Sequence, residues 1–140
     1  DFEVVNVDTD LNAGQSGGTA RITYKNMGKE TAKDAIARVS LFMPFSSEDD
    51  QAFLGTMNPQ DEATVTFKID VKDGATTGNY SINSEVKYTD LKGNSITSES
   101  VRIPLKVGPA RQSYTRIAIL ALIALAGIGI YIFKKKKGHD

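Results

Sequence analysis

Carboxylates in predicted loops are the residues of this chain whose type and spacing could do chemistry. Six of them are expected at one end of a β-domain: Asp8, Asp10, Glu48, Asp49, Asp50 and Asp73. Hard divalent cations such as Ca²⁺ take clustered oxygen ligands of this kind. The spacing matches no EF-hand loop, and a solvated acidic rim fits the same residues. We therefore predict no metal ligand and treat the six only as candidates for a cation.

Most other catalytic chemistry is missing from the chain. There is no Cys, and the only His is His139. Thiolate nucleophiles, Cys/His zinc sites, haem ligation and His-based triads are therefore impossible within these residues. The adjacent pair Asp49 and Asp50 has no His or Cys to work with. We predict that the chain is not an enzyme and that it binds neither a cofactor nor a small-molecule substrate.

One modification signal remains, the sequon Asn79-Tyr80-Ser81. An N-x-S/T sequence in an exported protein can accept a glycan if it lies at the surface. Asn79 falls where a strand is expected to begin, so it is a glycosylation candidate.

Alternation of apolar and polar residues predicts β-strands through residues 1–107. The inward positions of the four clearest strands are Ala37, Val39, Leu41, Met43; Ala63, Val65, Phe67, Ile69, Val71; Tyr80, Ile82, Ser84, Val86, Tyr88; and Val101, Ile103, Leu105, Val107. Three shorter strands fit 2–7, 19–25 and 52–55. Gly, Asn, Asp and Pro separate them, as turn residues do.

Seven short strands with one apolar face each predict an all-β fold, a seven-stranded antiparallel Ig-like β-sandwich. Phe2–Val7 and Ser100–Val107 are the expected edges. Pro104 supports an edge or a bulge in the last strand, because proline cannot donate a ladder hydrogen bond. Phe42 falls on the polar face of its strand, where it covers a sheet edge, marks a bulge or faces a neighbouring subunit.

Several short strings resemble the CARDB-like Ig domains of archaeal and bacterial surface proteins. They are Gly17–Tyr24 with Lys25-Asn26-Met27-Gly28, Phe53–Pro59, Gly78-Asn79-Tyr80 and Val86–Asn94. Archaeal S-layer-associated membrane proteins are similar in layout, with such a domain before a C-terminal helix and a lysine-rich tail. The resemblance implies adhesion, envelope architecture or an accessory role around membrane complexes, and it supplies no catalytic residues.

The apolar run before the C-terminus predicts a single transmembrane helix over 114–133. Residues 117–133 carry no charge and would span about 26 Å as a helix, close to the thickness of a bilayer core. Interfacial and flanking residues predicted to anchor it are Tyr114, Arg116, Tyr131, Lys134, Lys135, Lys136 and Lys137. The four lysines favour a cytoplasmic tail at 134–140, because basic residues accumulate on that side.

This orientation places residues 1–107 outside the cell, joined to the helix by a short linker at 108–113. Six linker residues reach about 20 Å at most, so we expect the domain close to the bilayer. Export needs an upstream signal. Since residue 1 is Asp, we expect either a processed chain or a piece of a longer one.

Charge is divided between the two predicted compartments. Residues 1–110 hold 11 Lys and Arg against 16 Asp and Glu, and residues 111–140 hold 6 against 1. The net charges are therefore −5 and +5, which the overall value of zero conceals. An acidic exterior without a basic stripe argues against a nucleic-acid partner.

Two functions fit these expectations. The first is a membrane-anchored extracellular module with a structural, adhesion or scaffolding role in the cell envelope. The second is an accessory subunit that docks onto a larger membrane complex, such as a transporter, a respiratory enzyme or a surface filament. Both predict membrane lipid and a protein at the cell surface as partners.

Overall fold

The computed structural model describes residues 1–110, whose regular structure is β-strand. Nine strands follow one another in this order: β1 (Phe2–Asn12), β2 (Gly18–Asn26), β3 (Ala32–Ser40), β4 (Phe45–Ser46), β5 (Gln51–Met57), β6 (Glu62–Val71), β7 (Gly78–Thr89), β8 (Ser95–Thr97) and β9 (Val101–Gly108). Residues 1–110 contain no helix long and apolar enough to cross a membrane. The predicted helix at 114–133 and the tail at 134–140 lie outside the described residues.

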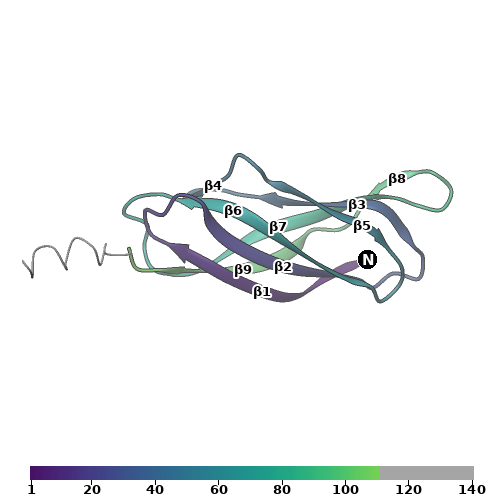
Figure 1. Cartoon of the computed structure of the whole chain (residues 1–140), viewed down its shortest axis with the longest axis horizontal. Helices are drawn as coiled ribbons and strands as arrows, with labels where there is room; N and C mark the ends of the chain where they lie inside the picture. Colours follow the sequence, from purple (N-terminus) through teal and green to yellow (C-terminus); the bar gives the residue numbers. More distant parts are fainter. Residues whose placement is uncertain (111–140) are drawn as a thin grey trace, which may run out of the picture. The chain divides into compact units, whose positions relative to one another are not determined.

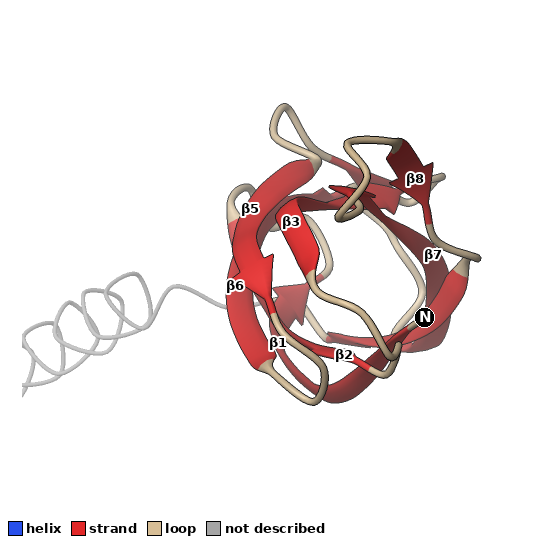
Figure 2. Cartoon of the chain, turned by 90° about the vertical axis from the view of Figure 1, so that its right-hand side faces the viewer, coloured by secondary structure: helices blue, strands red, loops and turns tan. Residues whose placement is uncertain are grey.

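The strands form one curled, mixed sheet. Its order is β4-β6-β2-β1-β9-β7-β3-β5, with β8 paired to β7. Seen along the strands, the sheet bends round a common centre like a half-barrel (Figure 2). β5 and β6 approach each other across the remaining side, so the two halves of the sheet enclose one core.

A short parallel contact joins the two halves. β1 and β9 pair only at Leu11 with Val107 and at Asn12 with Gly108, whereas β1 pairs along its length with β2 in antiparallel register. The prediction of a purely antiparallel fold was therefore wrong at this seam. Period-2 alternation shows which face of a strand is buried but not which way its neighbour runs.

The predicted number of strands was also too small. The two additional strands, β4 and β8, have two and three residues. A segment this short cannot show alternation, so sequence patterning has no signal for it. β4 exists because Phe45 pairs with Val71 at the end of β6.

Most buried hydrophobic positions were predicted to face inward, but five were not: Leu11, Ala32, Ala35, Phe45 and Met57. Ile22, Tyr24, Ile69, Ile82 and Ile103 are fully buried. Pro104 sits opposite Ser81 in a part of β9 that has β7 on one side and no strand in the described chain on the other. This locally open side fits the expected edge at Pro104, but β1 and β9, the two predicted edge strands, lie in the middle of the strand order, which ends at β4 and β5.

The predicted inward position of Met43 was wrong. Leu41 is half-buried, but β3 ends at Ser40 and the chain then turns, with the Phe45 N–H donating to the Phe42 carbonyl at 2.9 Å. The turn brings Phe45 inward, where its ring packs edge-on against Tyr80 with 5.2 Å between ring centres. Met43 is left exposed, and so is Phe42.

The unit has two ends, which we call the N-pole and the C-pole. At the N-pole the Met27 N–H donates to the carbonyl of Asp1, near the right of Figure 1. At the C-pole the Ala13 N–H donates to the carbonyl of Gly108, where β9 ends at the left of Figure 1. The described residues therefore begin at the N-pole and end at the C-pole.

Candidate functional site

The six candidate cation ligands are spread over three segments. Asp8 and Asp10 are exposed on β1, where they align with Arg21 and Thr19 of β2. The other four lie in loops: Glu48, Asp49 and Asp50 between β4 and β5, and Asp73 between β6 and β7.

Two of the four loop carboxylates lie against other residues of the domain. Asp50 Oδ2 lies 4.0 Å from Arg38 Nε in an exposed pair, a geometry that contributes little stability. Asp73 lies against the β1–β2 turn, since a Cβ atom at Gly14 would be 2.5 Å from its Oδ1. Within residues 1–110, no three His, Cys, Asp or Glu side chains are grouped to hold a metal ion. The cation hypothesis therefore has no preformed set of ligands in this part of the chain.

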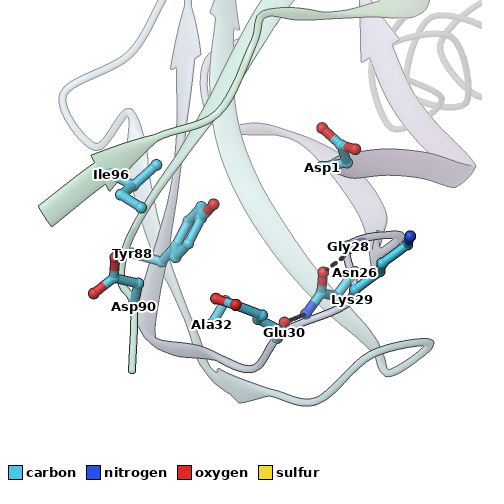
Figure 3. A pocket seen from close by; sticks show the side chains of 9 residues that line it. All are labelled: Asp1, Asn26, Gly28, Lys29, Glu30, Ala32, Tyr88, Asp90 and Ile96. Carbon is cyan, nitrogen blue, oxygen red and sulfur yellow. Dashed lines mark hydrogen bonds between the residues drawn. The ribbon is translucent and has the colours of Figure 1, made fainter. Parts of the chain in front are cut away.

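A small pocket opens at the N-pole (Figure 3), between Asp1 on one side and Tyr88 and Asp90 on the other. Its volume is about 190 Å³. Small-molecule sites usually have volumes of about 300–1,000 Å³. The polar side chain at its floor, Asn26, donates to the carbonyls of Met57 at 2.9 Å and Glu30 at 3.0 Å, and accepts from the Gly28 N–H. Asn26 thus ties loops together and offers no free group to a ligand.

The Asp90–Asn94 segment is the hairpin connection between β7 and β8. The Asn94 N–H donates to Asp90 Oδ1 at 2.8 Å, and the Lys92 N–H donates to the same oxygen at 2.9 Å. These bonds, above all the one from Asn94, hold the pKa of the Asp90 carboxyl below its usual value. The carboxylate of Asp90 is therefore engaged by its own turn.

Asn79 lies at the start of β7, opposite Lys106 of β9, and its side chain is exposed. Surface exposure is what a glycan acceptor needs, so glycosylation stays a prediction. The predicted membrane-anchoring residues from Tyr114 to Lys137 lie outside the described residues.

The strongest candidate for a functional surface is the solvent-facing side of β5, β3, β7 and β8, which we call the outer face. Two rows of side chains cross it, set by strand register. The first row runs Phe53, Ile36, Lys87, Thr97, and the second runs Gln51, Arg38, Glu85. Directly opposed side chains on one face lie close enough to form a continuous surface.

The outer face combines apolar and charged groups. Phe53 has 66% of its surface exposed and lies beside Ile36, which is also exposed. Next to them is a shallow depression of about 240 Å³, lined by Arg38, Glu85 and Lys87 among others. Protein interfaces often have such a composition, with an aromatic residue and Arg at the centre and charges of both signs around them.

Sequence reasoning did not find this surface, although a signal was present. Ala37 and Val39 were correctly predicted to face inward, and the same period of two places Ile36 and Arg38 outward. Phe53 follows by register with Ile36, which only the structure supplies.

Comparisons with known proteins identify a relative but no family. No model of a known protein family matches the chain. "Uncharacterized protein MJ1561" of Methanocaldococcus jannaschii is 28% identical over 147 residues, covering 99% of this chain. The chain spans 26% of that protein's length.

Two solved structures share part of the chain path. One is AvmM, described as catalysing macrocyclization in alchivemycin A biosynthesis, with a TM-score of 0.49 and 12% identity, over 81% of this chain and 90% of that one. The other is a cohesin module from a Clostridium perfringens family 33 glycoside hydrolase, with a TM-score of 0.45 and 9% identity, over 79% and 97%. Neither TM-score reaches 0.5, so these likenesses identify neither a fold family nor a function.

Proposed function

We propose that the chain is a membrane-anchored extracellular module with a structural, adhesion or scaffolding role in the cell envelope. Residues 1–107 form the exterior module, 114–133 the single membrane span, and 134–140 the cytoplasmic tail. The outer face is the surface that holds a protein partner. The observation that carries this proposal is the exposed Phe53 beside Ile36, next to a depression lined by charged residues of both signs.

The finer fold assignment belongs to the same proposal. We assign residues 1–107 to the Ig-like β-sandwiches. In support, β4-β6-β2-β1 and β9-β7-β3-β5 are the two halves of the sheet order, with the side chains of both directed at one core. Sandwiches of this class present loops at two ends and sheet faces to partners.

The matching relative comes from an archaeon and is several times longer than this chain. Both facts are compatible with an archaeal surface protein. We propose that this module is one part of such an envelope component. Residues 1–110 contain no Cys, so no disulfide contributes to their stability in an exterior location.

The alternative is an accessory subunit that docks onto a larger membrane complex. The same outer face favours it, because apolar side chains at the centre of a mixed-charge surface suit a stable partner as well as a transient one. The two functions differ in the partner: an envelope protein for the first, and a stoichiometric integral membrane complex for the second.

Purification of the full chain from its native membrane in mild detergent tests the proposal. The variant Phe53→Ser with Ile36→Thr removes the apolar centre of the outer face. We expect it to lose the co-purifying partner by at least roughly tenfold, about 1.4 kcal/mol of binding free energy. The matched control is Val5→Thr, an exposed apolar residue on β1.

The result is measured by quantitative mass spectrometry of the purified material. Equal partner recovery with the outer-face variant and the wild-type chain would contradict a role for this face. A wild-type chain that purifies alone, as a monodisperse monomer, would remove the accessory-subunit alternative.

A further inference from the structure

The turn after β3 exposes two large apolar side chains that the fold does not use. Met43 has 69% of its surface exposed and Phe42 has 55%. Among the exposed large hydrophobic residues of 1–110, they are the only two adjacent in sequence. Neither belongs to the outer face, so the proposed protein-binding surface does not account for them.

A series of backbone hydrogen bonds places this turn at the C-pole. The Lys72 N–H donates to the Pro44 carbonyl at 2.9 Å, directly after Met43. The Gly14 N–H donates to the Lys72 carbonyl at 3.2 Å, and the neighbouring Ala13 N–H donates to the Gly108 carbonyl at 3.1 Å. The apolar pair therefore lies at the same end of the unit as the last residue of β9.

The short stretch of chain after Gly108 limits how far the C-pole can lie from the predicted membrane span. Only residues 109–113 separate Gly108 from the span predicted to begin at Tyr114, a link of about 20 Å at full extension. On the proposed membrane anchorage, the C-pole is the end of the module held near the bilayer. Exposed Phe and Met side chains at such a site enter the region between headgroups and acyl chains, because that region accepts apolar side chains.

We propose that Phe42 and Met43 form a second, interfacial contact with the lipid surface, and that this contact restricts the tilt of the exterior module. The inference rests on the proposed membrane anchorage. At the same pole, three carboxylates share a shallow depression beside the β1–β2 turn with one basic residue, Lys68; they are Glu48, Asp49 and Asp70. These carboxylates disfavour an anionic surface, so the lipid contact is with a zwitterionic headgroup such as phosphatidylcholine.

Tryptophan fluorescence tests the contact, because the chain has no Trp of its own. The full chain carrying Phe42→Trp is reconstituted into phosphatidylcholine vesicles, and a second set contains brominated phosphatidylcholine as the quencher. We expect a blue-shifted emission and clear quenching of the introduced Trp. Met43→Trp, at the more exposed position, provides an independent second reading.

The matched control is Leu91→Trp, at an apolar position 58% exposed in the β7–β8 hairpin. This hairpin borders the N-pole pocket beside Asp1 (Figure 3), so its introduced indole is expected to emit as in water and to escape quenching. Equal quenching at positions 42 and 91 would overturn the proposal, because the module would then lie flat on the membrane.

Vesicle flotation separates this inference from the anchorage on which it rests. If the chain floats with vesicles but neither the Phe42→Trp nor the Met43→Trp variant is quenched, the interfacial contact is wrong and the anchorage stands. If the chain does not float, the anchorage itself fails and the contact fails with it. An emission that is blue-shifted but insensitive to brominated lipid would show a protein or a second copy covering the pair, which also overturns the lipid contact.

Discussion

A pair of buried hydroxyl groups connects the two halves of the sheet. Tyr24 of β2 and Ser84 of β7 lie with their oxygens 2.7 Å apart, and Ser84 Oγ donates to the carbonyl of Arg38 on β3 at 2.7 Å. Ser84 has a single hydroxyl proton, so Tyr24 is the donor to Ser84. Three strands are thereby linked through one polar path inside an apolar core.

This pair gives the fold a dependence on alkaline pH. Burial raises the pKa of Tyr24 from 10.0 to about 12, partly offset by the hydrogen bond with Ser84. The folded state holds the phenol proton more tightly than the unfolded state. Its stability therefore falls as pH rises from about 10 to about 12, by roughly 3 kcal/mol for two pKa units.

Tyr24→Phe tests this dependence. We expect the variant to lose about 1 kcal/mol at neutral pH, the value of one buried hydrogen bond, and to show a shallower loss of stability above pH 10. Denaturant unfolding between pH 7 and 11 measures both effects. Parallel slopes for the two proteins would show that Tyr24 does not cause the alkaline loss. Tyr80→Phe, at a half-buried tyrosine, is the control.

Side-chain burial could be predicted well from the sequence where alternation is long, and poorly where a strand ends. Ser84 was predicted to face inward from its place between Ile82 and Val86, yet nothing in the sequence identifies Tyr24 as its partner. Contacts of this kind join residues 60 positions apart and depend on strand order. Met43 is the opposite case. It was predicted to face inward but is exposed, because the chain turns there and the alternation of inward and outward positions stops.

At the scale of elements, Asn26 joins the end of β2 to two loops. Its side chain donates to Glu30 and Met57 and accepts from Gly28, while its own backbone bonds with Gln60 and Asp61. Nothing in the local sequence indicates these partners, because they lie in two different segments of the chain. Its amide fastens the β2–β3 connection to the end of β5.

Asn26→Ala is expected to destabilise the unit by about 2–3 kcal/mol, because three backbone groups lose their partner, one in a buried bond and two in part-buried bonds. Urea unfolding followed by circular dichroism measures the change. Asn83→Ala, at an exposed position on β7, is the control and should alter stability by less than about 0.5 kcal/mol. A similar small effect at Asn26 would show that water replaces the lost bonds.

Strand order is the part of the fold that the sequence could not supply. Each strand's inward face was readable from its own residues, but the seam between β1 and β9 involves just two residue pairs. The outer face depends on that order as well. Ile36, Phe53 and Lys87 become neighbours only because β5, β3 and β7 lie side by side.

At the scale of the whole molecule, residues 1–110 contain a complete core. The 19 buried hydrophobic side chains of residues 1–110 form one cluster. A domain of this size buries enough apolar surface to fold without disulfides. The proposed membrane anchor is therefore expected to locate the module and not to stabilise it.

Expression of residues 1–110 alone tests whether the module folds without the proposed membrane anchor. We expect one cooperative thermal unfolding transition, with a midpoint within a few degrees of that of the full chain in detergent. Calorimetry measures both midpoints. A fragment that does not unfold cooperatively would show that its core needs the remainder of the chain.

The opposite placement of the two ends has a mechanical consequence. If a force applied at Asp1 is opposed by the proposed membrane anchor, the tension enters through β1 and leaves through β9, parallel to the strands. Their ladders with β2 and β7 are then loaded in shear, so many hydrogen bonds must break together instead of one after another. On the proposed anchorage, this geometry resists a pull between the N-pole and the membrane.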